Sequence, residues 1–153
     1  MKGILDIYID GACSGNPGEA AIGVVIIEEG RKIAEVSKPI GRGTNNIAEY
    51  SALIRALQEA VLLKAKKLRI YTDSELLYNQ ITGIYKVKND FLKSFFEQAQ
   101  HLGKKFENIE MNFIPREQNK DADRLATQAL KKQANVVASV FKRSGEESPS
   151  SKG

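Results

Sequence analysis

The sequence of 153 residues has few of the side chains on which metal centres and disulfide-rich folds depend: one cysteine, one histidine and no tryptophan. A single cysteine, Cys13, excludes a disulfide within the chain and is typical of a reducing compartment, so we expect a cytoplasmic protein. Together with a single histidine, His101, it also excludes the usual zinc ligand sets. Any bound metal ion would therefore be held by oxygen atoms, which favours Mg²⁺, Mn²⁺ or Ca²⁺.

Long hydrophobic runs are absent as well. No apolar run approaches the roughly 20 residues that cross a bilayer, and the N-terminus has no apolar signal segment, so we expect neither membrane association nor secretion. Hydrophobic residues make up 42% and charged residues 27%, which is the mix of one soluble globular domain, and we expect a monomer. The net charge of +4 indicates a polyanionic partner only weakly, because many basic proteins bind no polyanion.

The apolar pattern predicts an α/β fold. Strands are expected at residues 3–10, 21–28 and 32–40, and the short turn at Glu29 and Gly30 makes the second and third antiparallel. The spacing of the apolar residues then changes from every second residue, as in strands, to every 3.6 residues, as in helices, and back twice. The later elements are a helix at 45–63 that follows Thr44, a strand at 68–73, helices from Ser74 towards Gly83 and at 89–102, a strand at 109–114, and a last helix around Ala122 to Leu130. This order predicts a five-stranded mixed sheet, an antiparallel meander extended by parallel strands, with helices flanking it.

Towards the C-terminus the pattern weakens. Residues 135–141 are β-branched enough for a short strand or a continuation of the helix, and the end of the chain is rich in serine and glycine. We therefore expect one folded domain at residues 1–134 and a tail at 135–153, of which residues 142–153 are flexible.

Two aspartates end predicted strands with the same local pattern. Asp10 follows Tyr-Ile and Asp73 follows Tyr-Thr. If the two strands are parallel neighbours, both carboxylates lie at the edge of the sheet where α/β proteins form their sites. The alternative is that each aspartate caps the turn that follows its strand.

Two further acids lie in the first turns of predicted helices. Glu49 borders the buried stripe of its helix, where an ionised carboxylate costs free energy unless a positive group lies opposite. For both Glu49 and Asp123 the alternative is a favourable interaction with the helix N-terminus. If all four acids met, they would repel one another unless they shared cations, and a pair of Mg²⁺ or Mn²⁺ ions is the arrangement for phosphoryl displacement. The spacing makes this meeting possible without showing it.

Four segments resemble, in order, the motifs of type 1 ribonuclease H. They are residues 10–18 (DGACSGNPG), 44–49 (TNNIAE), 71–74 (YTDS) and 119–126 (NKDADRLA). The resemblance implies a ribonuclease H-like fold and an endonuclease that hydrolyses the RNA strand of RNA–DNA hybrids, leaving 5′-phosphate and 3′-hydroxyl ends. The alternatives are a non-catalytic nucleic-acid-binding module on the same fold and a resolvase or transposase domain of the same superfamily.

The resemblance also implies roles for individual residues. Two Mg²⁺ or Mn²⁺ ions would be bound by Asp10, Glu49, Asp73 and Asp123, with Asp10 shared. The hybrid would be contacted by Gly11, Asn16, Thr44, Asn45, Asn46 and Glu75. Among these, the asparagines and Glu75 would face the minor groove, where the 2′-hydroxyl marks RNA, and Thr44 would hold a phosphate of the DNA strand. The alternative for the asparagines is turn formation.

Two features depart from the family's pattern. Many members carry a basic, tryptophan-rich protrusion, whereas here residues 83–89 lead almost directly into the next helix and leave Lys86, Lys88 and Lys93 as partial substitutes. The loop before the last helix usually contains a histidine, but here it contains Arg116.

Arg116 is a candidate catalytic residue because it lies seven residues before Asp123. Arginine does not shuttle a proton at neutral pH, but it binds a phosphate oxygen through two N–H groups and offsets developing negative charge. The alternative is a surface arginine paired with Glu117 or Asp121.

Overall fold

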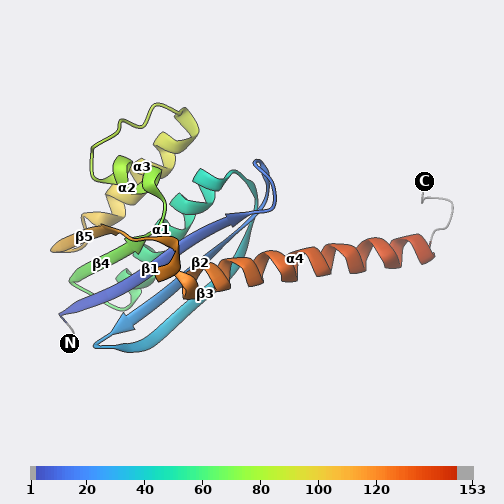
Figure 1. Cartoon of the computed structure of the whole chain (residues 1–153), viewed down its shortest axis with the longest axis horizontal. Coiled ribbons are helices and arrows are strands. Elements are labelled where there is room, and N and C mark those ends of the chain that lie inside the picture. The colour runs from blue at the N-terminus through green and yellow to red at the C-terminus, as the bar shows by residue number, and fades with distance from the viewer. Residues whose placement is uncertain (1–2, 148–153) are drawn as a thin grey trace.

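The computed structural model describes the backbone of residues 3–147 and the side chains of residues 3–136 (Figure 1). It has the predicted α/β fold, with five strands in one mixed sheet in the order β3-β2-β1-β4-β5. The elements are β1 (Ile4–Cys13), β2 (Gly18–Glu28), β3 (Arg31–Gly43), α1 (Asn45–Leu62), β4 (Lys67–Thr72), α2 (Glu75–Ile81), α3 (Asp90–Gly103), β5 (Asn108–Phe113), the short 3₁₀ helix η1 (Arg116–Gln118) and α4 (Lys120–Glu147). The predicted order of elements is confirmed, and most predicted boundaries are within three residues.

The sheet separates two layers of helices. β1 pairs antiparallel with β2, which pairs antiparallel with β3, whereas β4 and β5 run parallel to β1. α1, α2 and α3 cover one face, and α4 crosses the other face over β1, β2 and β3 (Figure 1). β2 therefore has helices on both faces, which explains why its sequence reads as a nearly continuous apolar run instead of an alternating one.

The hydrophobic core lies between the sheet and α1. Leu5, Ile7 and Ile9 alternate along β1 and are at most 2% exposed, and they pack with the apolar stripe of α1, which includes Tyr50 and Leu53. The other face of β1 carries Asp6, Tyr8 and Asp10. The last of these lies at the end of the sheet where α1 and α4 both begin.

A polar brace on that second face supports the pairing of β1 with β4. Asp6 accepts hydrogen bonds from Arg69 Nε at 2.6 Å and Arg69 Nη2 at 3.0 Å, and Tyr71 Oη donates to Asp6 at 2.9 Å. The rings of Tyr8 and Tyr71 stack with centroids 4.5 Å apart. These contacts join residues that face each other in the register of the two strands, and this register decides whether the acids at the strand ends meet.

The last helix extends beyond the sheet (Figure 1). Of the two structures expected for residues 135–141, the continued helix is present, and α4 also includes residues 142–147, for which we expected a flexible chain. No proline interrupts this stretch before Pro149, so nothing forces the helix to end earlier. Residues 148–153 lie outside the described residues, and the boundary of the domain at residue 134 stays a prediction. No helix within residues 3–147 is long and apolar enough to cross a membrane.

Two glycines let helices approach the sheet closely on its opposite faces. A Cβ atom on Gly11 would lie 2.4 Å from the carbonyl carbon of Ala48 in α1, and one on Gly23 would lie 2.1 Å from the carbonyl oxygen of Ala122 in α4. Gly23 is the partner of Asp10 in the register of β1 and β2. The two close approaches therefore bring the first turns of α1 and α4 to the same point on β1.

We expect Gly23→Ala to destabilise the protein, because the added methyl group forces α4 away from β2. The expected loss is about 2–3 kcal/mol in the free energy of unfolding, measured by urea denaturation. Gly3→Ala is the matched control, because nothing lies within 4 Å of a Cβ atom there. Equal stability of the two variants would contradict the tight contact.

Candidate active site

Three of the predicted acids meet at the end of the sheet. Asp10 lies on β1, Asp73 follows β4 directly, and Glu49 lies in the first turn and a half of α1. One carboxylate oxygen from each lies within 4.8 Å of the other two. The register of β1 with β4, in which Ile9 faces Thr72, accounts for the meeting of the two aspartates.

Glu49 is held by the backbone of β1. Its Oε1 atom accepts a hydrogen bond from the N–H of Gly11 at 3.0 Å. Thr44 is the N-cap of the helix that carries it, because its Oγ1 accepts from the N–H of Ile47 at 3.2 Å. The resemblance implied that Gly11 contacts substrate. In the structure its N–H donates to Glu49, and its lack of a side chain makes room for α1. A contact with substrate by Gly11 stays a prediction.

Asp123 approaches the group from the other face of the sheet. It lies in the first turn of α4, and its carboxylate is close enough to Asp10 to raise the pKa of Asp10 through its charge and a shared hydrogen bond. It is outside the group of three whose oxygens all lie within 4.8 Å of one another. The model therefore places all four predicted acids in one neighbourhood, with Asp123 at its border.

Burial and mutual repulsion dominate the electrostatics of the site. The pKa of Asp10 is raised to about 8, chiefly by burial and next by the negative charges of Asp73 and Asp123. Burial, followed by the charges of Asp10 and Asp73, raises the pKa of Glu49 well above its ordinary value, against the hydrogen bond from Gly11. Without a cation the cluster therefore holds protons that exposed carboxyl groups would release.

The charge of Arg116 acts on this cluster. Its positive charge lowers the pKa values of Asp10 and Glu49 against the larger effect of burial. Among the described side chains, Arg116 forms no ion pair with Glu117 or Asp121, the partners expected for a surface arginine. Asp121 instead lies 3.6 Å from Arg124. The position agrees with a role at the site, and that role stays a prediction.

The side chain of Asn119 is a component of the site that the sequence analysis missed. It is 1% exposed, and its Nδ2 atom donates to the carbonyl oxygen of Ile9 at 2.8 Å and to Oδ2 of Asp73 at 3.1 Å. An asparagine just before a helix suggests an N-cap. Asn119 opens the fourth motif of the resemblance (residues 119–126), but no role was assigned to it, and the local pattern did not indicate that its side chain turns into the sheet and contacts an acid.

The residues implied in hybrid binding lie on or next to the elements that carry the acids. Apart from Gly11, their side chains are exposed or half-exposed: Asn16, Thr44, Asn45, Asn46 and Glu75. Asn16 Oδ1 accepts the N–H of Asn45 at 3.1 Å, which joins the loop between β1 and β2 to the start of α1. Glu75 begins α2, two residues after Asp73. Four of the five are therefore together at the N-terminus of α1, and Glu75 lies beside Asp73.

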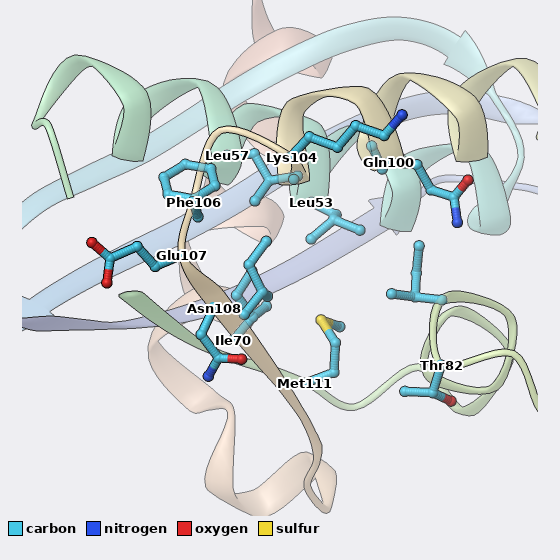
Figure 2. A pocket seen from close by; sticks show the side chains of 14 residues that line it. Leu53, Leu57, Ile70, Thr82, Gln100, Lys104, Phe106, Glu107, Asn108 and Met111 are labelled. Atoms are coloured by element: carbon cyan, nitrogen blue, oxygen red, sulfur yellow. The ribbon is translucent and has the colours of Figure 1, made fainter. Parts of the chain in front are cut away.

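A cavity of about 690 Å³ lies elsewhere in the protein (Figure 2). Its walls come mainly from α1, α3 and β5 and are mixed, with Leu53, Phe106 and Met111 beside Gln100, Lys104 and Glu107 (Figure 2). None of the four carboxylates lines it. The site therefore coincides with the convergence of acids and not with this cavity.

The raised pKa values predict that the metal-free protein becomes less stable as the pH rises. Between about pH 4 and pH 8 the folded state keeps a proton on Asp10 that the unfolded chain, with an ordinary pKa of 3.8, has released. Because the folded state then binds more protons, its free energy of unfolding falls through this window. The pKa of Asp6 is lowered, chiefly by its hydrogen bond with Arg69, so Asp6 affects the pH dependence of the free energy of unfolding only below this pH window.

Urea denaturation in EDTA at pH 5 and pH 8 measures this effect. Asp10→Asn should show a smaller loss between the two pH values than the unsubstituted protein, because it lacks the titrating group. A free energy of unfolding that increases from pH 5 to pH 8 would contradict the repulsion within the cluster.

Comparison with known proteins agrees with this arrangement. Residues 8–129 match a family model described as reverse transcriptase-like. A bifunctional protein of Mycobacterium tuberculosis is 40% identical over 86% of this chain, and ribonuclease HI of Halobacterium salinarum is 39% identical over 84%. The chain spans 37% of the first protein's length and 65% of the second's.

Two solved structures have the same fold over nearly their whole length. The crystal structure of RNase H1 from Halobacterium salinarum has a TM-score of 0.83 and 38% identity, covering 85% of this chain and 99% of that one. LC11-RNase H1, crystallised with an RNA/DNA hybrid, has a TM-score of 0.81 and 41% identity over the same shares of the two chains. Sequence, fold and the cluster of acids agree: this chain belongs to the type 1 ribonuclease H family.

Proposed function

We propose that this chain is a metal-dependent endonuclease that hydrolyses the RNA strand of RNA–DNA hybrids and leaves 5′-phosphate and 3′-hydroxyl ends. The observation that carries the proposal is the group of Asp10, Glu49 and Asp73, with carboxylate oxygens within 4.8 Å of one another. The hybrid bound to LC11-RNase H1, which is 41% identical, supports the class of substrate.

The side chains present fit divalent cations with oxygen ligands. Every donor in the group is a carboxylate oxygen, the ligand type that Mg²⁺ and Mn²⁺ prefer. The raised pKa values of Asp10 and Glu49 indicate a surplus of buried negative charge that a cation would offset. Asp10, Glu49, Asp73 and Asp123 would hold two ions, with Asp10 shared. Such a pair supplies an activated water for attack on phosphorus and stabilises the leaving 3′-oxygen.

The start of α1 would orient the hybrid above these acids. Asn16, Asn45 and Asn46 carry amides that both donate and accept hydrogen bonds, which suits base edges and 2′-hydroxyl groups in a minor groove. The Thr44 oxygen accepts a bond within the cap, and its hydroxyl hydrogen remains for a phosphate oxygen of the DNA strand. Because Glu49 lies on the same helix, contacts made here fix the position of the scissile phosphate relative to the acids.

Arg116 would hold the reacting phosphate. Its charge acts on Asp10 and Glu49, and a guanidinium near the acids could bind a non-bridging oxygen and offset charge that develops in the transition state. It cannot replace a histidine as a proton donor. Release of the 3′-hydroxyl would then take its proton from solvent.

Cleavage of a labelled hybrid tests the proposal. With Mg²⁺ or Mn²⁺ we expect cuts in the RNA strand, and none in EDTA. Asp10→Asn should abolish cleavage and remain folded, because it removes a shared ligand and relieves repulsion. Asp90→Asn, at an exposed aspartate that begins α3, is the control and should retain activity.

Duplex RNA, duplex DNA and single strands under the same conditions define the specificity. Binding of hybrid without cleavage at any metal concentration would favour the non-catalytic module. Full activity of Asp10→Asn would contradict the assignment of the ligand.

A second prediction concerns Arg116. We expect Arg116→Ala to lower kcat by roughly ten- to a thousand-fold with the fold intact, and Arg116→Lys to recover part of the loss, because lysine keeps the charge without the planar fork. Arg31→Ala, at an exposed arginine that begins β3 at the far end of the sheet, is the matched control. A kcat within twofold of the unsubstituted value for Arg116→Ala at saturating hybrid and Mg²⁺ would support the surface role.

A further inference from the structure

Asn119 occupies the junction between the elements that carry the acids. It lies between η1 and α4, where the chain passes from β5 across the ends of β4 and β1 (Figure 1). It is 1% exposed, which is rare for an asparagine, and it is one of the largest fully buried side chains. Burial of a carboxamide costs free energy unless its groups are hydrogen-bonded, so the contacts of Asn119 should explain why it is buried.

The two contacts of its Nδ2 atom fix the orientation of the amide. Both partners, the carbonyl oxygen of Ile9 and Oδ2 of Asp73, are acceptors, so the nitrogen and not the oxygen must face them. The Oδ1 atom is then buried without a partner among the described residues. An amide that leaves its acceptor unpaired is poorly optimised for stability, which suggests that the site depends on its donor.

The backbone of the same residue reaches two more groups of the site. Its carbonyl oxygen accepts the N–H of Asp123 at 3.1 Å, and its N–H donates to the carbonyl oxygen of Arg116 at 2.9 Å. One residue therefore touches the strand just before Asp10, the carboxylate of Asp73 and the helical turn of Asp123. These three acids come from three different elements.

We propose that Asn119 is a positioning residue for the metal site. A carboxylate with one oxygen hydrogen-bonded cannot rotate freely and keeps its other oxygen for a cation. The bond to Ile9 ties this arrangement to β1, and the bond from Asp123 ties it to α4. This inference rests on the proposed function in one respect, namely that the acids bind a divalent cation.

Calorimetric titration with Mg²⁺, and with Mn²⁺ in parallel, tests the inference without reference to catalysis. Asn119→Leu keeps a similar volume and removes the donor, and we expect it to weaken Mg²⁺ binding by about 10- to 100-fold. The increase in melting temperature on addition of Mg²⁺ should shrink in parallel. Asn119→Ser, a smaller change, should weaken binding in the same direction.

Asn112→Leu is the matched control. Asn112 lies half-buried on β5, its Nδ2 atom is buried without a partner among the described residues, and no acid of the site is bonded to it. Its variant should bind Mg²⁺ within about twofold of the unsubstituted protein, whatever its stability. Equal Mg²⁺ affinity of the Asn119 variants and the control would overturn the inference and leave the proposed function standing. Absence of Mg²⁺ and Mn²⁺ binding by the unsubstituted protein would overturn both.

A measurement on the unsubstituted protein covers the case in which the Asn119 variants fail to fold. In ¹⁵N-labelled protein the side-chain amide resonances of Asn119 should shift during a Mg²⁺ titration, because Asp73 Oδ2 changes its charge environment. Those of Asn112 should not shift. An unchanged Asn119 amide at saturating Mg²⁺ would show that the contact is structural only.

Discussion

Repulsion between buried carboxylates is the constraint on which this structure depends. Two unit charges 4 Å apart interact by about 4 kcal/mol at an effective dielectric constant of 20, and Asp10, Glu49 and Asp73 form three such pairs at comparable separations. Their sum is as large as the whole stability of an ordinary domain, about 5–15 kcal/mol. At neutral pH the metal-free acids are therefore not all ionised, and the raised pKa values of Asp10 and Glu49 express this.

The fold opposes this repulsion by fixing each acid to a different rigid element. The pairing of β1 with β4 places the two aspartates, and the brace between Asp6 and Arg69 supports that register. Gly11 admits α1 and donates its N–H to Glu49, while Gly23 admits α4 on the other face. Because strand pairing and two helix contacts together hold the acids in place, the acids could move apart only if a helix moved.

Most of the fold could be predicted from the sequence because it follows from local patterns, whereas for the acids these patterns left capping open and the resemblance to type 1 ribonuclease H selected them. Strand ends at Asp10 and Asp73 and a helix start at Thr44 are visible in the period of the apolar residues. What could not be predicted comes from contacts between elements distant in the chain. Asn119 bonds to residues 110 and 46 positions away, and the need for a glycine at position 23 exists only once α4 lies on β2. The extent of α4 was left open over residues 135–141 and not expected over 142–147, although a polar sequence without proline permits a helix.

The same charges explain how a site rich in acids can accept a polyanion. With all four carboxylates ionised, they and Arg116 would carry three negative charges, which would repel a phosphodiester. Under the proposed function, two divalent cations would change this to a single positive charge, which one phosphodiester neutralises. Affinity for the scissile phosphate would thus depend on prior occupation of the metal site, and substrate would favour metal binding by the same amount. The net charge of +4 on the whole chain supplies only a weak long-range attraction, so under the proposed function the place where the backbone docks would be decided by the metal-loaded acids and by the asparagines at the start of α1.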